Sequence, residues 1–406
     1  ENCSALNLLP WETAWRRGTA QMMRPVDMPL QDFQNSDTAG NWNLPALSAP
    51  PAFEKVLHRL LERNSPTPQE LQTVDACIGR LQDIVSKIGV GWNIRPFGSS
   101  ANGFATRGSD LDVTCYHTLE DEQDSMLAIQ HLKMNLAPLL RKEPGFEIIE
   151  EVWSARVPIL KLRFDGSTDV DLSCHNPQAL QNTFLLWSYG KLHPLVRGLV
   201  IVIKLWAKTE KLCGASLRHL STYSLTLMAI FFLQVQPRYS FPTLPTWAFL
   251  SSGVSENIAA IKWQVPPHVK LPELVAGFFW FYSSEFSWGE EVVSIRLGRR
   301  CLRSTLDFQL LSGRIGRRLH IEDPFLLSRN LNCVLSPENE EKLRERIEAM
   351  ANDLLTAWEV PASFVPDMED GGHEDRQELP SGPEASEVPV SRLALSGAMR
   401  WLGSAD

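Results

Sequence analysis

The stretch from Pro96 to Asp112, PFGSSANGFATRGSDLD, decides how the rest of the chain is interpreted. The preceding residues 93–97 are predicted to form a short strand that runs into the Gly-Ser turn. Gly98 lets the backbone approach a phosphate closely, and the hydroxyl and N–H of Ser99 can bind that phosphate. The order strand, Gly-Ser turn, loop, Asp-Leu-Asp therefore predicts a phosphate-binding turn beside a pair of carboxylates.

The acids Asp110 and Asp112 are predicted to share one face of a strand that continues to residue 116, because residues two apart on a strand point the same way. Neighbouring carboxylates repel each other and raise each other's pKa unless a cation neutralises them. Mg²⁺ prefers carboxylate and phosphate oxygens. Asp171, or its neighbour Asp169, would supply a third acid and complete a two-metal site for nucleotidyl transfer. The alternative for a lone Asp-x-Asp pair is a solvated strand edge.

The apolar pattern divides the chain into four parts. Residues 51–177 mix helical and strand-like periods, which predicts an α/β catalytic domain in which Thr67 caps the start of a helix. Residues 178–360 contain helices rich in Leu and aromatic residues, which predicts a mostly α-helical domain. Residues 1–50 are predicted to be an irregular arm, and the Pro-, Gly- and acid-rich residues 361–406 a disordered tail.

Net charge, hydropathy and cysteine content limit the functions and cellular locations that this chain can have. The 406 residues carry a net charge of −9, of which residues 366–406 contribute −6 through nine acids and three bases. The nearly neutral remainder permits RNA binding only where basic residues cluster. No stretch approaches the ~18 apolar residues of a membrane span, so we expect no membrane partner. The seven scattered cysteines indicate neither a zinc site nor a disulfide framework. We expect an intracellular, cytoplasmic protein, with nucleus and mitochondrion left open because the sequence begins at Glu1 and an upstream segment could be missing.

Further motifs follow in order: VDLS at 170–173, KLWAK at 204–208, LSTYS at 220–224, GFF at 277–279 and IEDPF at 321–325. With the opening stretch, this series resembles the noncanonical poly(A) polymerases and terminal uridylyltransferases, which are DNA polymerase β-like nucleotidyltransferases. The resemblance covers about residues 85–345. It implies an α/β nucleotidyltransferase domain with a palm-like mixed sheet, a mostly helical PAP-associated domain, and an active-site cleft between them.

The resemblance also implies roles for single residues. Asp110, Asp112 and Asp171 would be the catalytic residues and would bind Mg²⁺ or Mn²⁺. Two lysines would contact the triphosphate, a tyrosine would stack on the base, and Asn182 would read the ribose 2′-hydroxyl. The full nucleotide-binding set would be Gly98, Ser99, Asn176, Asn182, Thr183, Lys204, Lys208, Thr222, Tyr223, Asp323 and Arg329.

The residues by themselves leave other interpretations open. Lys204 and Lys208 are four apart and share a helix face, so they could form a solvated stripe. Tyr223 could be a core tyrosine near a helix start. Asn176, which precedes a proline, could be a turn residue at a strand end.

The base-choosing motif departs from the family pattern. Uridylyltransferases of the family carry a His before the Asn of this loop, whereas this chain carries Arg329 before Asn330, and Leu326 stands where an orienting acid often is. Arg329 could donate to uracil O4 or to adenine N1, or it could turn to solvent or RNA. Asp323 could accept from uracil N3–H or adenine N6. Loop length and the Arg-Asn pair slightly favour UTP.

The sequence therefore predicts a template-independent RNA 3′-terminal ribonucleotidyltransferase that adds UMP, slightly favoured, or AMP. Its partners would be an RNA 3′ end, UTP or ATP, and an RNA-binding protein that compensates for weak intrinsic RNA affinity. Rival hypotheses are an inactive scaffold and a transferase of small molecules. Candidate RNA contacts, whose alternative is a solvated charged face, are Arg296, Arg299, Arg300, Arg303, Arg314, Arg317 and Arg318.

Overall fold

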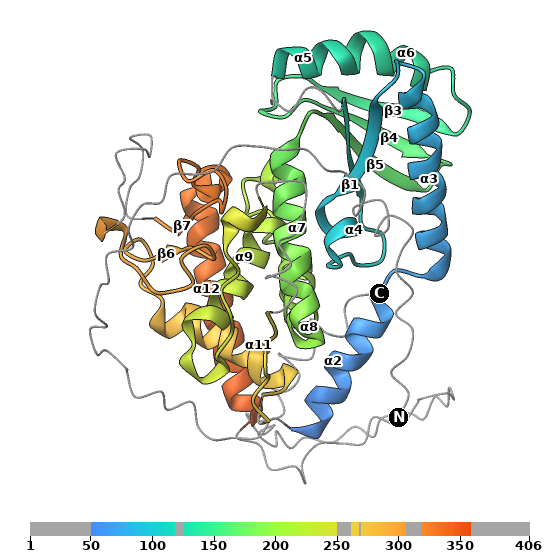
Figure 1. Ribbon diagram of the computed structural model, residues 1–406. Helices are drawn as coiled ribbons and strands as arrows, with labels where there is room; N and C mark the ends of the chain where they lie inside the picture. The colour runs from blue at the N-terminus through green and yellow to red at the C-terminus, as the bar shows by residue number, and fades with distance from the viewer. Residues whose placement is uncertain (1–49, 118–124, 250–260, 268, 306–317, 359–406) are drawn as a thin grey trace, which may run out of the picture.

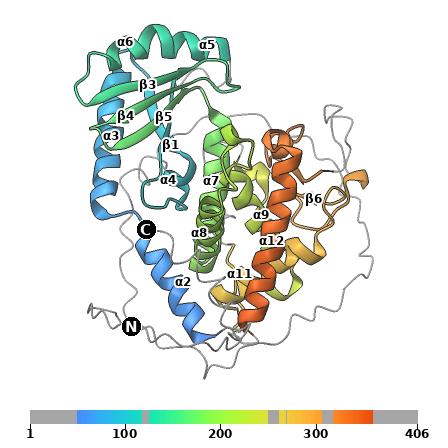
Figure 2. The same cartoon turned by 180° about the vertical axis from the view of Figure 1, so that it is seen from behind.

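The computed structural model describes residues 50–117, 125–249, 261–267, 269–305 and 318–358. These residues fold into two bodies that lie side by side, one built on a sheet and the other on helices (Figure 1; Figure 2 shows the opposite side). The predicted arm, apart from Pro50, and the predicted acidic tail lie outside the described residues.

The sheet has five strands in the order β1-β2-β5-β4-β3. β2 and β5 are parallel neighbours, and all other adjacent pairs are antiparallel, so the expected mixed sheet is confirmed. The parallel pair lies inside the sheet, where neither strand forms an edge. The strands are β1 (Trp92–Phe97), β2 (Leu111–His117), β3 (Phe146–Val152), β4 (Ile159–Phe164) and β5 (Thr168–Cys174).

Helices cover one face of this sheet and share an apolar core with it. One is α3 (Pro68–Ser86), whose first turn carries the predicted Thr67 cap. The other is a helical run over residues 125–140 that has a wide π-helical turn in its middle. Pro138, which has no N–H to donate, follows that turn. The run consists of α5 (Ser125–Gln130), the π turn (His131–Leu136) and α6 (Ala137–Leu140).

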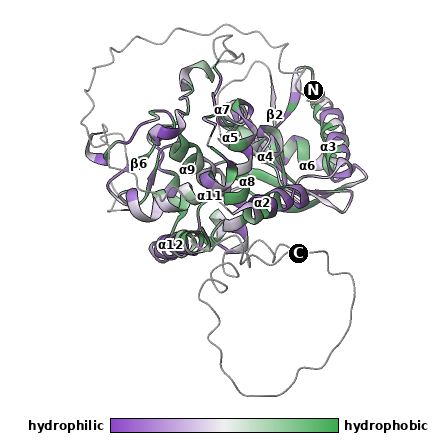
Figure 3. Cartoon of the chain, turned by 90° about the horizontal axis from the view of Figure 1, so that it is seen from below, coloured by the Kyte–Doolittle hydropathy of each residue, from purple (hydrophilic) through white to green (hydrophobic). Residues whose placement is uncertain are grey.

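The second body surrounds α8 (Pro194–Thr209), in which every residue from Gly198 to Ala207 is buried. Figure 3 shows α8 as mostly hydrophobic in the middle of the molecule, whereas the peripheral helices α3 and α12 carry hydrophilic residues. No helix in the described ranges is long and apolar enough to cross a membrane. The other main elements are α7 (Pro177–Leu192), α9 (Thr222–Val235), α11 (Leu271–Trp280), a π turn (Phe281–Glu285), β6 (Val292–Val293), β7 (His320–Ile321) and α12 (Pro337–Trp358).

Helix α2 (Pro51–Arg63) packs differently from what the sequence predicted. Its buried side chains Phe53, Leu57 and Leu60 belong to the core of the helical body, together with residues of α8 and α11. The sequence grouped residues 51–63 with the catalytic domain by their place in the chain, whereas their buried side chains pack on the helical body. The partners of this apolar face come much later in the sequence, so no local pattern reveals them.

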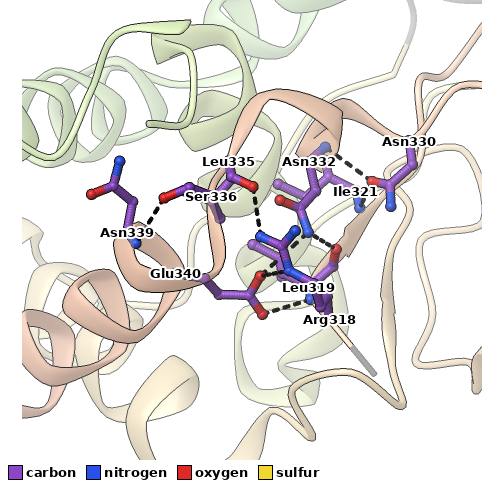
Figure 4. Close-up of polar contacts among 9 residues, drawn as sticks. All are labelled: Arg318, Leu319, Ile321, Asn330, Asn332, Leu335, Ser336, Asn339 and Glu340. Carbon is purple, nitrogen blue, oxygen red and sulfur yellow. Dashed lines mark hydrogen bonds and ion pairs between the residues drawn. The ribbon is translucent and has the colours of Figure 1, made fainter. Parts of the chain in front are cut away.

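The segment that leads into β7 is fixed by Glu340 near the start of α12 (Figure 4). Its Oε2 accepts a hydrogen bond from Nε of Arg318 at 2.9 Å, and its Oε1 accepts from the N–H of Leu319 at 2.9 Å. Arg318 also donates to the carbonyl oxygen of Leu335 at 2.6 Å. Glu340 is buried, so water cannot replace these bonds. The network therefore positions β7, which Asp323 follows after one residue.

We expect Glu340→Ala to lower the free energy of unfolding by about 2–3 kcal/mol, because it leaves the Leu319 N–H and the half-buried Arg318 without their acceptor. Urea denaturation measures the change. The exposed neighbour Glu341 supplies the control, and Glu341→Ala should change the same free energy by less than about 0.5 kcal/mol. Equal losses in both variants would contradict the prediction.

Candidate active site

Two of the three predicted catalytic acids face each other across the parallel strands. Asp112 on β2 is the register partner of Asp171 on β5. On its other side Asp112 pairs with Phe97, the last residue of β1, directly before the Gly-Ser turn. Asp110 precedes β2 and is exposed. The sheet thus brings together acids that lie far apart in the sequence.

The negative charges of these three acids repel one another. Burial, together with the negative charges of Asp171 and Asp110, raises the pKa of Asp112 to about 7, while Lys204 acts in the opposite direction. Burial also raises the pKa of Asp171, and Lys161 partly offsets this. A cation would relieve this repulsion, and carboxylate oxygens are ligands that Mg²⁺ prefers. The chemistry of the three acids therefore fits a divalent metal ion.

The acids are not preassembled as a metal site. In the part of the chain that the structure describes, no group of three or more His, Cys, Asp or Glu side chains stands in an arrangement that could hold a metal ion. Binding would have to draw at least one carboxylate toward the others. Such an adjustment is plausible for Asp110, because its side chain is exposed at the start of β2.

Asp169, the alternative candidate for the third acid, forms an ion pair with Arg163. Its Oδ1 accepts a hydrogen bond from Nε of Arg163 at 2.9 Å, across the β4–β5 pair, and both side chains are largely exposed. This ion pair leaves Asp171 as the acid of β5 that lies beside Asp112.

The Gly-Ser turn is shaped by Asp112. Gly98 has φ of +67°, and a Cβ atom at this position would lie 2.2 Å from Oδ2 of Asp112. The Gly98 N–H donates to Oγ1 of Thr183 at 2.9 Å, and that hydroxyl donates in turn to the carbonyl oxygen of Ala179 at 2.7 Å. Thr183, predicted to contact the nucleotide, thus holds the turn from α7. Ser99 lies in the short helix α4 (Gly98–Asn102) that the turn begins.

The two predicted asparagines have different surroundings. Asn176 is the N-cap of α7, where its Oδ1 accepts from the N–H of Ala179 at 3.4 Å, which agrees with the alternative of a turn residue at a strand end. The Oδ1 of Asn182 is buried and accepts no hydrogen bond from the described residues. Asn182 therefore keeps an acceptor that the described residues leave unused.

The two predicted lysines reach from α8 to the loop between α4 and β2. Lys204 is 3% exposed, and its Nζ donates to the carbonyl oxygen of Phe104 at 2.6 Å. Burial, together with the charge of the neighbouring Lys208, lowers its pKa to about 8, while Asp112 acts in the opposite direction. Lys208 is exposed and makes a longer contact, 3.4 Å from Nζ to Oγ1 of Thr106. A solvated stripe is therefore wrong for Lys204. The sequence analysis assigned no role to Phe104 or Thr106, because their partners come about a hundred residues later.

The predicted base-binding residues meet at the start of α9. Tyr223 follows Thr222, the first residue of the helix, and its hydroxyl is buried without a hydrogen-bond partner among the described residues. Burial raises the pKa of Tyr223 well above its ordinary value, and the charge of Asp323 adds to this. Asp323 is 0% exposed; its Oδ1 accepts from the N–H groups of Phe325 and Leu326, and its Oδ2 lies 3.4 Å from Nη1 of Arg329. The Asp323 carboxylate is thus occupied by its own loop.

The predicted RNA-contacting arginines are largely engaged within the protein. Arg296 pairs with Glu322, Arg300 with Glu291, and Arg318 with Glu340. Arg314 and Arg317 lie outside the described residues. Three of these arginines therefore neutralise buried carboxylates of the protein itself.

Comparisons with known proteins agree with this arrangement. Residues 53–191 match the family model for the central palm domain of mitochondrial-like poly(A) RNA polymerase, and residues 270–329 match the model for the Cid1 family poly A polymerase. A solved structure of Cid1, described as having RNA terminal uridylyl transferase activity, is similar with a TM-score of 0.64 and 26% identity, over 75% of this chain and 94% of that one. The chain belongs to the noncanonical poly(A) polymerase and terminal uridylyltransferase family. Another structure of Cid1, with a TM-score of 0.63, contains Mg and 3′-dATP.

Curated relatives of the family include both kinds of enzyme. Poly(A) RNA polymerase GLD2 of Xenopus tropicalis is 27% identical over 321 residues, which are 76% of this chain and 58% of that protein. Terminal uridylyltransferase 7 of Homo sapiens is 31% identical over 291 residues, 67% of this chain and 19% of that protein. The chain thus spans less than two thirds of the length of either relative.

We expect Gly98→Ala to displace the Asp112 carboxylate, because the new methyl group would overlap its Oδ2. Gly166 has nearly the same backbone conformation, φ of +69°, with open space around its Cβ position. Gly166→Ala therefore carries the same backbone strain without the collision. Urea denaturation should show Gly98→Ala to be the less stable of the two by about 1–3 kcal/mol. Equal stability of the two variants would show that Asp112 does not restrict the turn.

Proposed function

We propose that this chain is a template-independent RNA 3′-terminal ribonucleotidyltransferase that adds UMP, slightly favoured, or AMP. The observation that carries the proposal is the pairing of Asp112 with Asp171 on the inner parallel strands, against the glycine turn that Asp112 shapes. The family contains both poly(A) polymerases and terminal uridylyltransferases among the relatives of this chain, which supports the reaction class and leaves the base open.

In the proposed reaction the 3′-hydroxyl of RNA attacks the α-phosphate of the nucleotide, and pyrophosphate leaves. Asp110, Asp112 and Asp171 would hold two Mg²⁺ or Mn²⁺ ions, which supply neutralising charge and lower the pKa of the attacking hydroxyl. Asp171 would lie nearest that hydroxyl. The exposed Lys208, whose contact with Thr106 is long, can turn to the triphosphate and stabilise the charge that develops on pyrophosphate.

The nucleotide's sugar and base have candidate partners in the helical body. The unpaired Oδ1 of Asn182 can accept a hydrogen bond from the ribose 2′-hydroxyl. Tyr223 supplies a ring on which any base can stack. The Asp323 Oδ1 accepts from its own loop, and Arg329, whose Nη1 lies 3.4 Å from the Asp323 Oδ2, is the candidate residue for choosing the base. A guanidinium only donates, which suits the O4 acceptor of uracil, whereas adenine presents an N6 donor beside its N1 acceptor.

We further propose an intracellular setting and an RNA-binding protein partner. Arg296, Arg300 and Arg318 form ion pairs within the protein. This supports weak intrinsic RNA binding, for which a partner protein would compensate. The rival hypothesis of an inactive scaffold predicts that at least one catalytic acid is lost. All three acids are present, so transferase activity is the better supported function.

The reaction is tested by extending a 5′-labelled single-stranded RNA with the purified 406-residue chain. Each of the four nucleoside triphosphates is supplied separately, with Mg²⁺ or Mn²⁺. We expect extension with UTP exceeding that with ATP, and a loss of at least about 100-fold in the double variant Asp110→Ala/Asp112→Ala. Extension by the double variant at the same rate, or none by the folded wild type with any nucleotide, would contradict the proposal.

Base choice is tested by Arg329→Leu. We expect the ratio of kcat/KM for UTP to that for ATP to fall about tenfold, the size of one good polar contact to a base. A ratio is insensitive to partial unfolding, which matters because Arg329 also pairs with Asp323. Arg299→Leu, at an exposed arginine that precedes this loop in the chain, should leave the ratio unchanged. An unchanged ratio in Arg329→Leu would exclude Arg329 as the residue that chooses the base.

A further inference from the structure

The loop between α4 and β2, residues 103–109, is held by bonds from both bodies although it has no regular structure for most of its length. It leads directly to Asp110, which is exposed and lies outside β2. No sheet hydrogen bond therefore fixes Asp110 itself. The position of Asp110 therefore depends both on β2, which begins at the next residue, and on how the preceding loop is anchored.

One side of the loop is anchored by α8. Arg197 donates from Nε to the carbonyl oxygen of Gly103 at 2.8 Å. Lys204 and Lys208 continue this row with bonds to Phe104 and Thr106, at spacings of seven and four residues that place all three on one helix face. These bonds hold the first half of the loop and none of them reaches beyond residue 106.

The second half of the loop is anchored by the segment between α2 and α3. The Arg107 N–H donates to the carbonyl oxygen of Asn64 at 2.8 Å. The Gly108 N–H donates to Oε1 of Glu70 at 2.9 Å. Gly108 lies two residues before Asp110, so the Glu70 bond is the side-chain contact of this loop that comes nearest to Asp110 from the α3 side.

Glu70 uses its two oxygens for different purposes. Oε2 accepts from the N–H of Thr67 at 2.7 Å and closes the capping box of α3, in which Oγ1 of Thr67 accepts from the Glu70 N–H at 3.1 Å. Oε1 is not needed for the cap and serves Gly108. Burial acts to raise the pKa of Glu70, but hydrogen bonds from Thr67 and Gly108 outweigh it and lower the pKa overall. The carboxylate is therefore charged at neutral pH, and both bonds are charge-assisted.

We propose that Glu70 is a positioning residue for the transfer reaction, holding Gly108 so that Asp110 stands at the correct distance from Asp112 and Asp171. This inference rests on the proposed function, since it assigns Asp110 a part in catalysis. We assign Glu70 no contact with the substrate or with a metal ligand. It acts through the backbone of residues 108–110, and its anchor is the rigid first turn of α3.

The chain offers a matched pair of variants that separates this role from helix stability. Thr67→Ala removes the acceptor for the Glu70 N–H but leaves the Glu70–Gly108 bond in place. Glu70→Ala removes the other half of the capping box, the bond from the Thr67 N–H, together with the Gly108 bond, and keeps the bond from the backbone N–H of residue 70 to Oγ1 of Thr67. Glu70→Gln keeps one acceptor oxygen, so it can serve only one of the two N–H groups. Both alanine variants should lower Tm by about 2–4 °C.

The measurements are steady-state RNA extension and amide hydrogen exchange of the full chain. We expect Glu70→Ala to lower kcat about tenfold with little change in KM for the nucleotide, Glu70→Gln to give an intermediate kcat, and Thr67→Ala to keep kcat within about twofold. Exchange in a peptide covering residues 104–110 should quicken in Glu70→Ala and not in Thr67→Ala.

Two results would overturn the inference. One is an equal loss of kcat in the two alanine variants, which would attribute the effect to helix stability alone. The other is unchanged exchange at residues 104–110 in Glu70→Ala. The exchange measurement also distinguishes the two proposals. A wild-type chain that extends no RNA would refute the proposed function, and quickened exchange in Glu70→Ala would still establish that Glu70 holds the loop.

Discussion

Electrostatic repulsion between carboxylates on the inner strands is the constraint on which the rest of the site depends. Asp112 and Asp171 are neighbours across a parallel pair, and burial with shared negative charge raises the pKa of both. Holding such acids together lowers the free energy of unfolding, and the packing of the sheet against its helices must offset this loss. The same arrangement gives a divalent cation the oxygen ligands it prefers. The Gly-Ser turn requires glycine at position 98, because a side chain there would collide with Asp112, one member of this pair.

The second feature is that neither body completes the site alone. The sheet carries the acids, but the Gly98 turn is pinned by Thr183 of α7. The loop before Asp110 is held by α8 through Lys204. A buried lysine that donates to a carbonyl oxygen of the other body keeps its charge near the acids and lowers their repulsion. Alignment of the two bodies and electrostatic balance of the acids are therefore coupled by the same side chain.

Much of the fold was predictable from local pattern. The strands 93–97 and 111–116, the Thr67 cap and the helices of the second body follow from periodicity and from short-range capping rules. The pairing of Asp112 with Asp171 was expected from the order of motifs in the family. The features that the sequence left open concern partners distant in the sequence. The packing of α2, the burial of Lys204 and the ion pairs of Arg296 and Arg300 all involve such partners.

The sequence by itself indicated the proposed reaction class, because the acids and the glycine turn suit nucleotidyl transfer and the ordered series of motifs resembles the family. Only the tertiary structure decided what each polar side chain is free to do. The Oδ1 of Asp323 accepts hydrogen bonds from its own loop. The Oδ1 of Asn182 has no partner among the described residues, and Glu70, which caps α3, also accepts a hydrogen bond from Gly108. A hydrogen bond forms with whatever group lies within about 3 Å. Which group that is depends on the folding of segments that are remote along the chain.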